Sequence, residues 1–133
     1  MHADSSLGAT VGWAHPALVV WALLAALWNF GGAWQLARGL PPPGPTASTI
    51  AGLILLAIAV GLGVAVRRWP KVFVALTVVA GLGALVGVVG AFTQDPALWP
   101  SESWRWAGVF LNGGGFVAAV VALFAFFVRA PGR

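Results

Sequence analysis

The stretch IAGLILLAIAVGLGVAV, residues 50–66, contains no charged side chain and none that forms strong hydrogen bonds. It is too long for a typical buried strand. As a helix rising about 1.5 Å per residue it spans roughly 25 Å, close to the thickness of the hydrocarbon core of a bilayer. Arg67 and Arg68 end the stretch, as expected where a helix emerges among polar headgroups. The stretch therefore predicts a transmembrane helix.

Three further apolar segments, residues 16–37, 71–92 and 104–128, are each long enough to cross a bilayer as a helix. The connection 38–49 holds four of the nine prolines, so it is expected to form an extended outer loop. The connection 93–103 mixes acids with apolar and aromatic residues, and is expected to form an outer loop at the membrane interface. The order of these segments predicts four consecutive crossings.

Composition agrees with this pattern. Only 8% of the residues are charged while 60% are hydrophobic, and the mean hydropathy is +0.94. A soluble domain has about 25% charged residues, enough to cover its surface. The chain is therefore expected to be an all-α integral membrane protein, with one domain over residues 1–133 folded as a four-transmembrane-helix bundle. The formal charge of +4 does not indicate nucleic-acid binding, because the basic residues stand at the ends of apolar segments.

Orientation follows from the basic residues, which accumulate on the cytoplasmic side of membrane proteins. Four crossings put both termini and the turn between the second and third helices on one side. Arg38 and Arg105 belong to the opposite side. The sequence thus predicts both termini in the cytoplasm, most simply at a bacterial inner (plasma) membrane. The basic residues on the side of the termini are Arg67, Arg68, Lys71, Arg129 and Arg133.

Side chains that can accept hydrogen bonds from free N–H groups stand before several predicted helices. Tryptophan favours membrane interfaces, because its ring is apolar while its N–H needs a partner. Trp21 and Trp28 lie deeper and are expected to pack between helices. The expected caps are Ser48 or Thr49, Asp95 before a short turn starting at Pro96, and Ser101 or Ser103. The expected interface anchors are Trp34, Trp99, Trp104 and Trp106 on the outer side and Trp69 on the inner side.

Small residues recur at a spacing of four in the two central helices. Such faces let helix backbones approach closely, which favours association in lipid. Two interpretations remain open: the two helices pack on each other as a tight hairpin, or one of the faces meets a partner subunit. The two faces are Ala57, Gly61 and Ala65 in the second helix, and Gly83, Gly87 and Ala91 in the third.

Asn29 and Asn112 occupy similar depths in the first and last helices, each beside a run of glycines. An amide in hydrocarbon needs a hydrogen-bonding partner. One interpretation is an interhelical hydrogen bond between the two side chains. The other is a site for the polar head of a ligand with a flat or elongated apolar body, such as a quinone, pigment or sterol. The accompanying residues are Gly31, Gly32, Gly113, Gly114 and Gly115, with Gln35 as a further polar group.

The sequence offers little catalytic chemistry. It has no cysteine, no charged residue in the middle of a predicted helix and no metal-ligating cluster. His15 has no second histidine on a facing helix for haem, and is expected to bind water or headgroups. We therefore expect a non-enzymatic protein without a metal.

The chain is expected to be an accessory, non-catalytic subunit of a larger membrane complex of the respiratory, photosynthetic or oxidase type. Its partners are then membrane lipids and other membrane subunits. The first alternative is a small homo-oligomeric channel or carrier for a neutral solute, lined by Asn29, Asn112 and Gln35. The second is a protein that binds a lipid, quinone or pigment; no other cofactor is expected.

Overall fold

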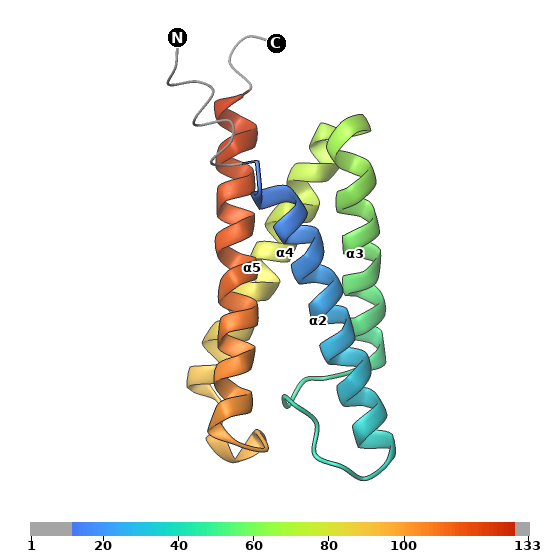
Figure 1. Ribbon diagram of the computed structural model, residues 1–133, viewed down its shortest axis with the longest axis vertical. Coiled ribbons are helices and arrows are strands. Elements are labelled where there is room, and N and C mark those ends of the chain that lie inside the picture. The colour runs from blue at the N-terminus through green and yellow to red at the C-terminus, as the bar shows by residue number, and fades with distance from the viewer. Residues whose placement is uncertain (1–11, 130–133) are drawn as a thin grey trace.

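Residues 12–129 are described by a computed structural model, in which four long helices run alternately up and down (Figure 1). All four are long and apolar enough to span a membrane. Their bounds lie within two residues of the predicted ranges, while His2 and Arg133 fall outside the described residues. The helices are α2 (Ala14–Ala37), α3 (Thr49–Arg68), α4 (Pro70–Thr93) and α5 (Glu102–Val128), with a short 3₁₀ helix η1 (Pro96–Leu98) before α5.

Three of the predicted caps are formed. The side-chain oxygens of Ser48, Asp95 and Ser101 accept hydrogen bonds from backbone N–H groups two or three residues further on, at 3.1, 2.9 and 3.3 Å. Each bond satisfies an N–H that has no partner within the helix. Because Ser101 is the cap, α5 begins at Glu102, earlier than the residue 104 expected from hydropathy.

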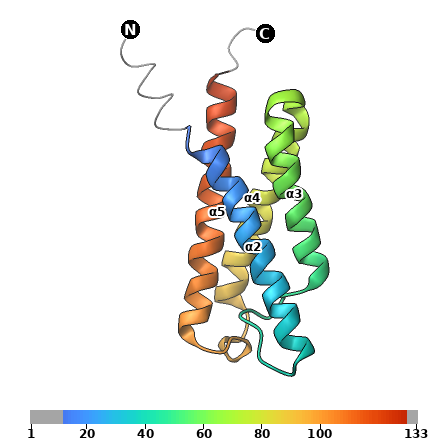
Figure 2. The ribbon, with the colours of Figure 1, turned by 45° about the vertical axis from the view of Figure 1, so that its right-hand side comes forward.

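The helices associate mainly as two pairs, α2 with α3 and α4 with α5, and α3 with α4 is the least extensive contact among the four neighbouring pairs. A single residue, Trp69, separates α3 from α4, and from that turn the two helices diverge (Figures 1 and 2). The expected tight hairpin is therefore wrong in its packing, although the short turn between the helices is present.

The small-residue faces explain this difference. Gly61 does lie against α4, where a side chain added to it would meet the Leu76 Cδ1 atom at 2.7 Å. Ala57 and Gly83, however, are exposed, and nothing lies within 4 Å of a Cβ added at Gly83. Gly87 faces α5, because its added Cβ would meet the Asn112 amide nitrogen at 2.6 Å. The two faces thus do not pack on each other along their length; Ala65 and Ala91 are buried near opposite ends of the bundle.

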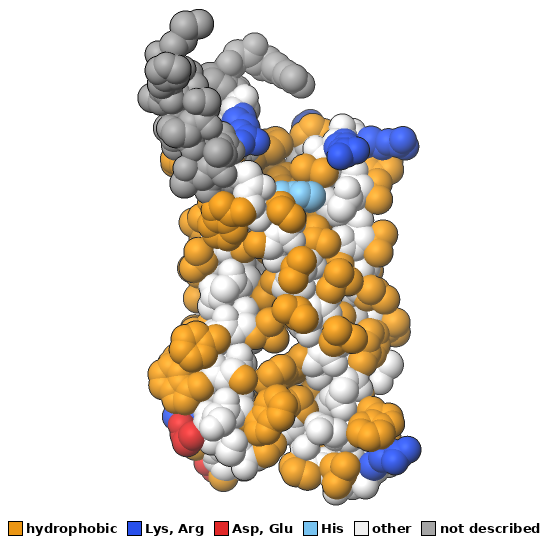
Figure 3. All heavy atoms as spheres, viewed as in Figure 1, with side chains coloured by type: hydrophobic (Ala, Val, Ile, Leu, Met, Phe, Trp, Pro, Cys, Tyr) orange, Lys and Arg blue, Asp and Glu red, His pale blue; other side chains and the backbone are white. Residues whose placement is uncertain are grey.

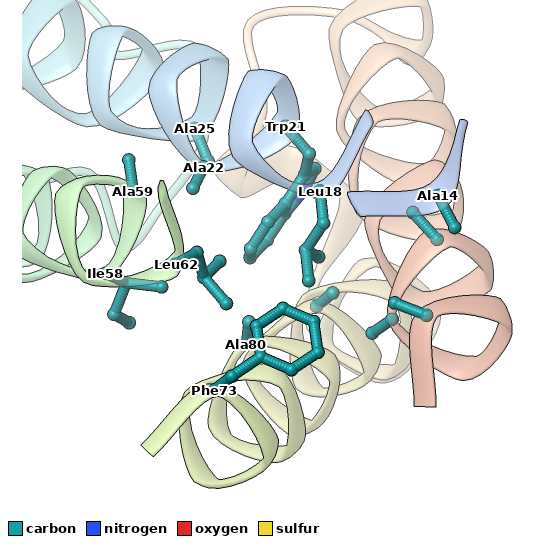
Figure 4. Close-up of a cluster of buried hydrophobic side chains, with 14 of the residues drawn as sticks. Ala14, Leu18, Trp21, Ala22, Ala25, Ile58, Ala59, Leu62, Phe73 and Ala80 are labelled. Carbon is teal, nitrogen blue, oxygen red and sulfur yellow. The ribbon is translucent and has the colours of Figure 1, made fainter. Parts of the chain in front are cut away.

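The core lies in the half of the bundle nearer the chain ends. Leu18, Trp21, Leu62 and Phe73 point toward one another there, surrounded by alanines from all four helices (Figure 4). Thr77 is also buried, and its hydroxyl donates to the Phe73 carbonyl at 2.8 Å, whereas the Trp21 Nε1–H is buried without a hydrogen-bond partner in the described chain. Small residues bring the backbones close, which gives the facing helices many dispersion contacts.

The chain ends of the described part, near Trp13 and Arg129, lie at the same end of the bundle (Figure 1). Lysine and arginine side chains gather at the two ends, and the visible face between them is apolar (Figure 3). Most large apolar side chains of α2 to α5 are exposed on the outside, such as Phe110 at 75%. An outer surface of this kind suits hydrocarbon.

Gly115 provides a sharp test of the core, because a Cβ there would overlap the indole of Trp21. We expect Gly115→Ala to lower the free energy of unfolding in detergent by about 1–3 kcal/mol, the cost of overpacking. Gly114→Ala is the matched control: nothing lies within 4 Å of its added Cβ, so it should be neutral or slightly stabilising. Equal stabilities of the two variants, measured by denaturant titration, would contradict this packing.

Candidate functional site

A cavity of about 430 Å³ lies between the four helices, in the half of the bundle away from the chain ends. This interhelical cavity is within the range of roughly 300–1,000 Å³ typical of small-molecule sites. Figure 3 shows the molecule hollowed between α5 and α2 at this level. Its lining comprises Trp21, Ala25, Trp28, Asn29, Gly44, Pro45, Thr46, Ala51, Ile54, Leu55, Ile58, Val79, Ala80, Gly83, Val86, Gly87, Gly90, Ala91, Gln94, Trp99, Arg105, Gly108, Leu111 and Asn112.

The cavity exists because α3 and α4 diverge below their turn while α2 and α5 cross in front of them (Figures 1 and 2). Toward the chain ends, the core around Leu18 and Phe73 closes it. At the other end, the loop segment 44–46 and the indole of Trp99 cover it. Pro43 and Gly44 are buried, so the proline-rich loop folds back over the helices rather than extending into water as expected.

Both asparagines line the cavity, but the expected hydrogen bond between them is not formed. Asn29 donates through Nδ2 to the Ala25 carbonyl at 2.9 Å and accepts through Oδ1 from the Ser48 N–H at 3.2 Å. Asn112 donates to the Gly108 carbonyl at 3.1 Å. The carbonyl one turn back lies closer than a partner across a cavity, so each amide first satisfies itself on its own helix.

The two asparagine amides differ in the hydrogen-bonding groups that they leave free. Asn29 fixes the start of α3 through Ser48, which makes it a structural link between α2 and the loop. Asn112 stands in a notch on α4 that Gly87 leaves open, and its Oδ1 and second N–H contact no other hydrogen-bonding group in the described part of the chain. Asn112 is therefore the asparagine with free hydrogen-bonding groups at the cavity; Gln94, which also lines it, makes no side-chain hydrogen bond within the described chain.

The glycines that were expected to make room for a ligand do not line the cavity. The space where a side chain of Gly32 would stand is filled by Ala47 and Pro43 of the loop, and the corresponding space at Gly115 is filled by Trp21. Gly31, Gly113 and Gly114 have nothing within 4 Å of an added Cβ and lie away from the cavity. The space instead borders Gly44, Gly83, Gly87, Gly90 and Gly108. Of these, the sequence singled out Gly83 and Gly87, but as a helix-packing face rather than as a ligand site.

Arg105 is the only charged residue of the lining. Its Nη1 donates to the Ala91 carbonyl at 3.2 Å, near the C-terminus of α4, where a cation is favourable to the helix dipole. Its Nη2 pairs with the Glu102 carboxylate at 2.7 Å, while Nε is buried without a partner. The guanidinium thus joins the start of α5 to the end of α4 and is already neutralised by Glu102.

One wall of the cavity is open to the outside between α3 and α4. Ile54, Val79 and Val86 line the cavity and are also 56%, 55% and 70% exposed. Gly83 lies between the two valines on α4 and leaves a gap where a side chain would stand. We call these four residues the α3–α4 gap; all are apolar, and the gap faces the same direction as the outer hydrophobic surface of both helices.

Other predicted residues lie elsewhere. Gln35 is half-buried near the end of α2 with Oε1 unpartnered, and it does not line the cavity. His15 is bound to the Leu62 carbonyl at 3.1 Å through Nε2, which ties α2 to α3 instead of reaching headgroups. Within residues 12–129 no group of three or more His, Asp or Glu is placed to hold a metal ion.

The predicted interface tryptophans divide into two sets. Trp34 and Trp69 are 56% and 54% exposed at opposite ends of the bundle, and the Arg38 guanidinium lies 4.5 Å from the ring centroid of Trp34. Trp104 packs edge-on against Trp28 at 5.5 Å between centroids, which bridges α5 and α2 beside the cavity. Trp99 belongs to the cavity lining itself, and Trp106 packs on Phe92 at 5.7 Å.

Comparison of the chain with protein-family models, curated proteins and solved structures finds no match. The fold and the cavity therefore define the class of this protein by themselves: it is an all-helical protein with four helices that are long and apolar enough to span a membrane.

Proposed function

We propose that this protein binds a lipid-soluble molecule with a polar head in the interhelical cavity. The observation that carries the proposal is the cavity itself: it is of ligand size, mostly apolar, and bordered by a few polar groups near one end. A cleft of this volume, mostly apolar with a few convergent polar groups, is the usual form of a small-molecule site. Binding of a lipid-soluble ligand, the second alternative considered from the sequence, is therefore favoured over the function of an accessory subunit.

The carrier alternative fits the geometry less well. A path across the membrane would have to continue past Leu18, Leu62 and Phe73, which fill the bundle toward the chain ends. Gln35, one of the three polar residues expected along such a path, lies outside the cavity. The cavity is closed toward the chain ends and open sideways, which favours binding over passage.

Extraction of the purified protein with organic solvent tests this proposal. We expect mass spectrometry to find about one lipid-soluble ligand per chain, as for other enclosed sites of this volume. Leu55→Trp fills the cavity and should lower the recovered amount severalfold. Leu53→Trp places the same bulk on the exposed face of the same helix and should leave the recovery unchanged. A ligand-free extract, or equal recovery from both variants, would contradict the proposal.

A specific observation also keeps the accessory-subunit function as a second candidate. Gly113 and Gly114 form an open notch on α5, with nothing within 4 Å of an added Cβ at either position. Large apolar side chains flank this notch, so another transmembrane helix could approach it closely. The notch and the cavity involve different surfaces, and the two functions are compatible.

Purification in mild detergent separates this second candidate from the first. We expect a membrane-protein partner to accompany the native chain and to be lost from Gly114→Leu, because the side chain would hold the partner helix away. Gly63→Leu on α3 is the control, since that glycine is exposed and equally open. A chain that migrates alone under these conditions rules out a stable partner.

We further propose that both termini face the cytoplasm of a bacterial cell, with the membrane crossed by all four helices. Arg67, Arg68 and Lys71 at the turn support this orientation, as does Arg129 at the end of α5. At the opposite end of the described chain stand Arg38 and Arg105, and the latter is paired with an acid.

Cysteine labelling measures the orientation, since the native chain has no cysteine to react. Ser103→Cys should react with a membrane-impermeant maleimide in intact cells. Val128→Cys should react only after the membrane is made permeable. The reverse pattern would show that the termini lie outside, and the unmodified chain provides the blank.

A further inference from the structure

Three of the eight tryptophans surround one cavity, although their usual place in a membrane protein is the interface. Trp21 is 94% buried in the wall toward the core, while Trp28 and Trp99 line the end nearer the loops. Indoles favour flat rings, through offset-stacked or edge-on contacts worth more than their buried area. A cavity with three indoles therefore suits a ligand whose head is a flat ring.

Apart from the Nε of Arg105, the free hydrogen-bonding groups beside these rings are neutral. Asn112 has an unused N–H and Oδ1, and the Trp28 Nε1–H has no hydrogen-bond partner in the described chain. Trp28 reaches the cavity through its contact with Gly108, one turn from Asn112 on α5. Two N–H donors at one cavity, the Asn112 amide on α5 and the Trp28 indole on α2, suit oxygen acceptors on a ligand, such as ring carbonyls.

Charge argues against an acidic head. Among residues 12–129, Arg105 is the only cation that lines the cavity, and its Nη2 pairs with the Glu102 carboxylate at 2.7 Å, so the pair carries no net charge. Bringing a carboxylate or phosphate into this apolar space would require removing its water without an unpaired cation to replace that hydration. A neutral carbonyl loses far less on the same transfer.

The α3–α4 gap gives the ligand its direction. Its four residues are apolar and exposed, and Gly83 lies one turn along α4 from Gly87, where Asn112 forms part of the cavity wall. A head bound at that wall therefore places an attached apolar chain in the gap, from which it continues into hydrocarbon. The gap meets the apolar outer surface of α3 and α4, so it also offers a route of access from hydrocarbon.

We propose that the interhelical cavity binds a quinone-type ligand, a flat ring bearing carbonyl oxygens with an apolar tail, taken sideways from the bilayer through the α3–α4 gap. The ring lies among Trp21, Trp28 and Trp99, a carbonyl accepts from Asn112 and Trp28, and the tail passes Gly83. This rests on the proposed function and adds the chemistry of the head and the path of the tail.

Binding of decylubiquinone to the protein in detergent micelles tests this assignment, read out as saturable quenching of tryptophan fluorescence. Decylbenzene, with the same tail and a ring without carbonyls, should not compete. Oleate, with an apolar tail and an anionic head, should not compete either. If decylbenzene or oleate reverses the quenching by displacing decylubiquinone from the saturable site, the assignment of a neutral carbonyl head is overturned.

Two pairs of variants locate the head and the tail. Asn112→Leu keeps the shape of the side chain in the Gly87 notch and should weaken binding about tenfold, the effect of one well-made hydrogen bond in a dry site. Gly83→Phe, which obstructs the gap, should also weaken binding by about tenfold or more. Gly113→Phe is its matched control, since both glycines are helical with nothing within 4 Å of an added Cβ.

The outcomes separate this inference from the proposed function. If extraction yields a stoichiometric ligand but decylubiquinone does not saturate, the cavity binds another class of molecule and the quinone assignment fails alone. If extraction yields nothing and no quinone binds, both fail. If quinone binds equally to Gly83→Phe and Gly113→Phe, the sideways path is wrong.

Discussion

The close approach of α4 to α5 is the contact on which the rest of the structure depends. Small residues on both helices allow it, as at Gly81 and Ala119, where an added Cβ on the glycine would lie 3.0 Å from the alanine Cβ. In lipid this contact is favoured by dispersion and by the absence of any competing hydrophobic force. Because α4 packs along α5, it diverges from α3, and α3 packs on α2 instead. The interhelical cavity is the space that this exchange of partners leaves behind.

Sequence reasoning predicted the helices well because their signals are local. Hydropathy located the four segments, and the caps at Ser48, Asp95 and Ser101 depend on residues two or three positions apart. The helix pairing could not be predicted in the same way. Ladders of small residues exist on several faces of these helices, and which one is used depends on bulky partners such as Trp21 and Leu76, which come from other helices.

The candidate site shows the same division. Asn29 and Asn112, which the sequence singled out as polar groups at one depth, both line the cavity. Their mutual hydrogen bond was wrong, since the nearest acceptor for each amide is on its own helix. The gap between α3 and α4 could not be predicted from the sequence, because sequence alone does not distinguish an exposed valine beside a ligand from an exposed valine on the outer surface.

The one-residue joint at Trp69 has a mechanical consequence. α3 ends at Arg68 and α4 begins at Pro70, whose ring restricts the first turn, so the angle between the helices is set at their shared apex. The α3–α4 gap lies along the divergence that starts at this joint, so its width follows from the angle at which the two helices leave Trp69.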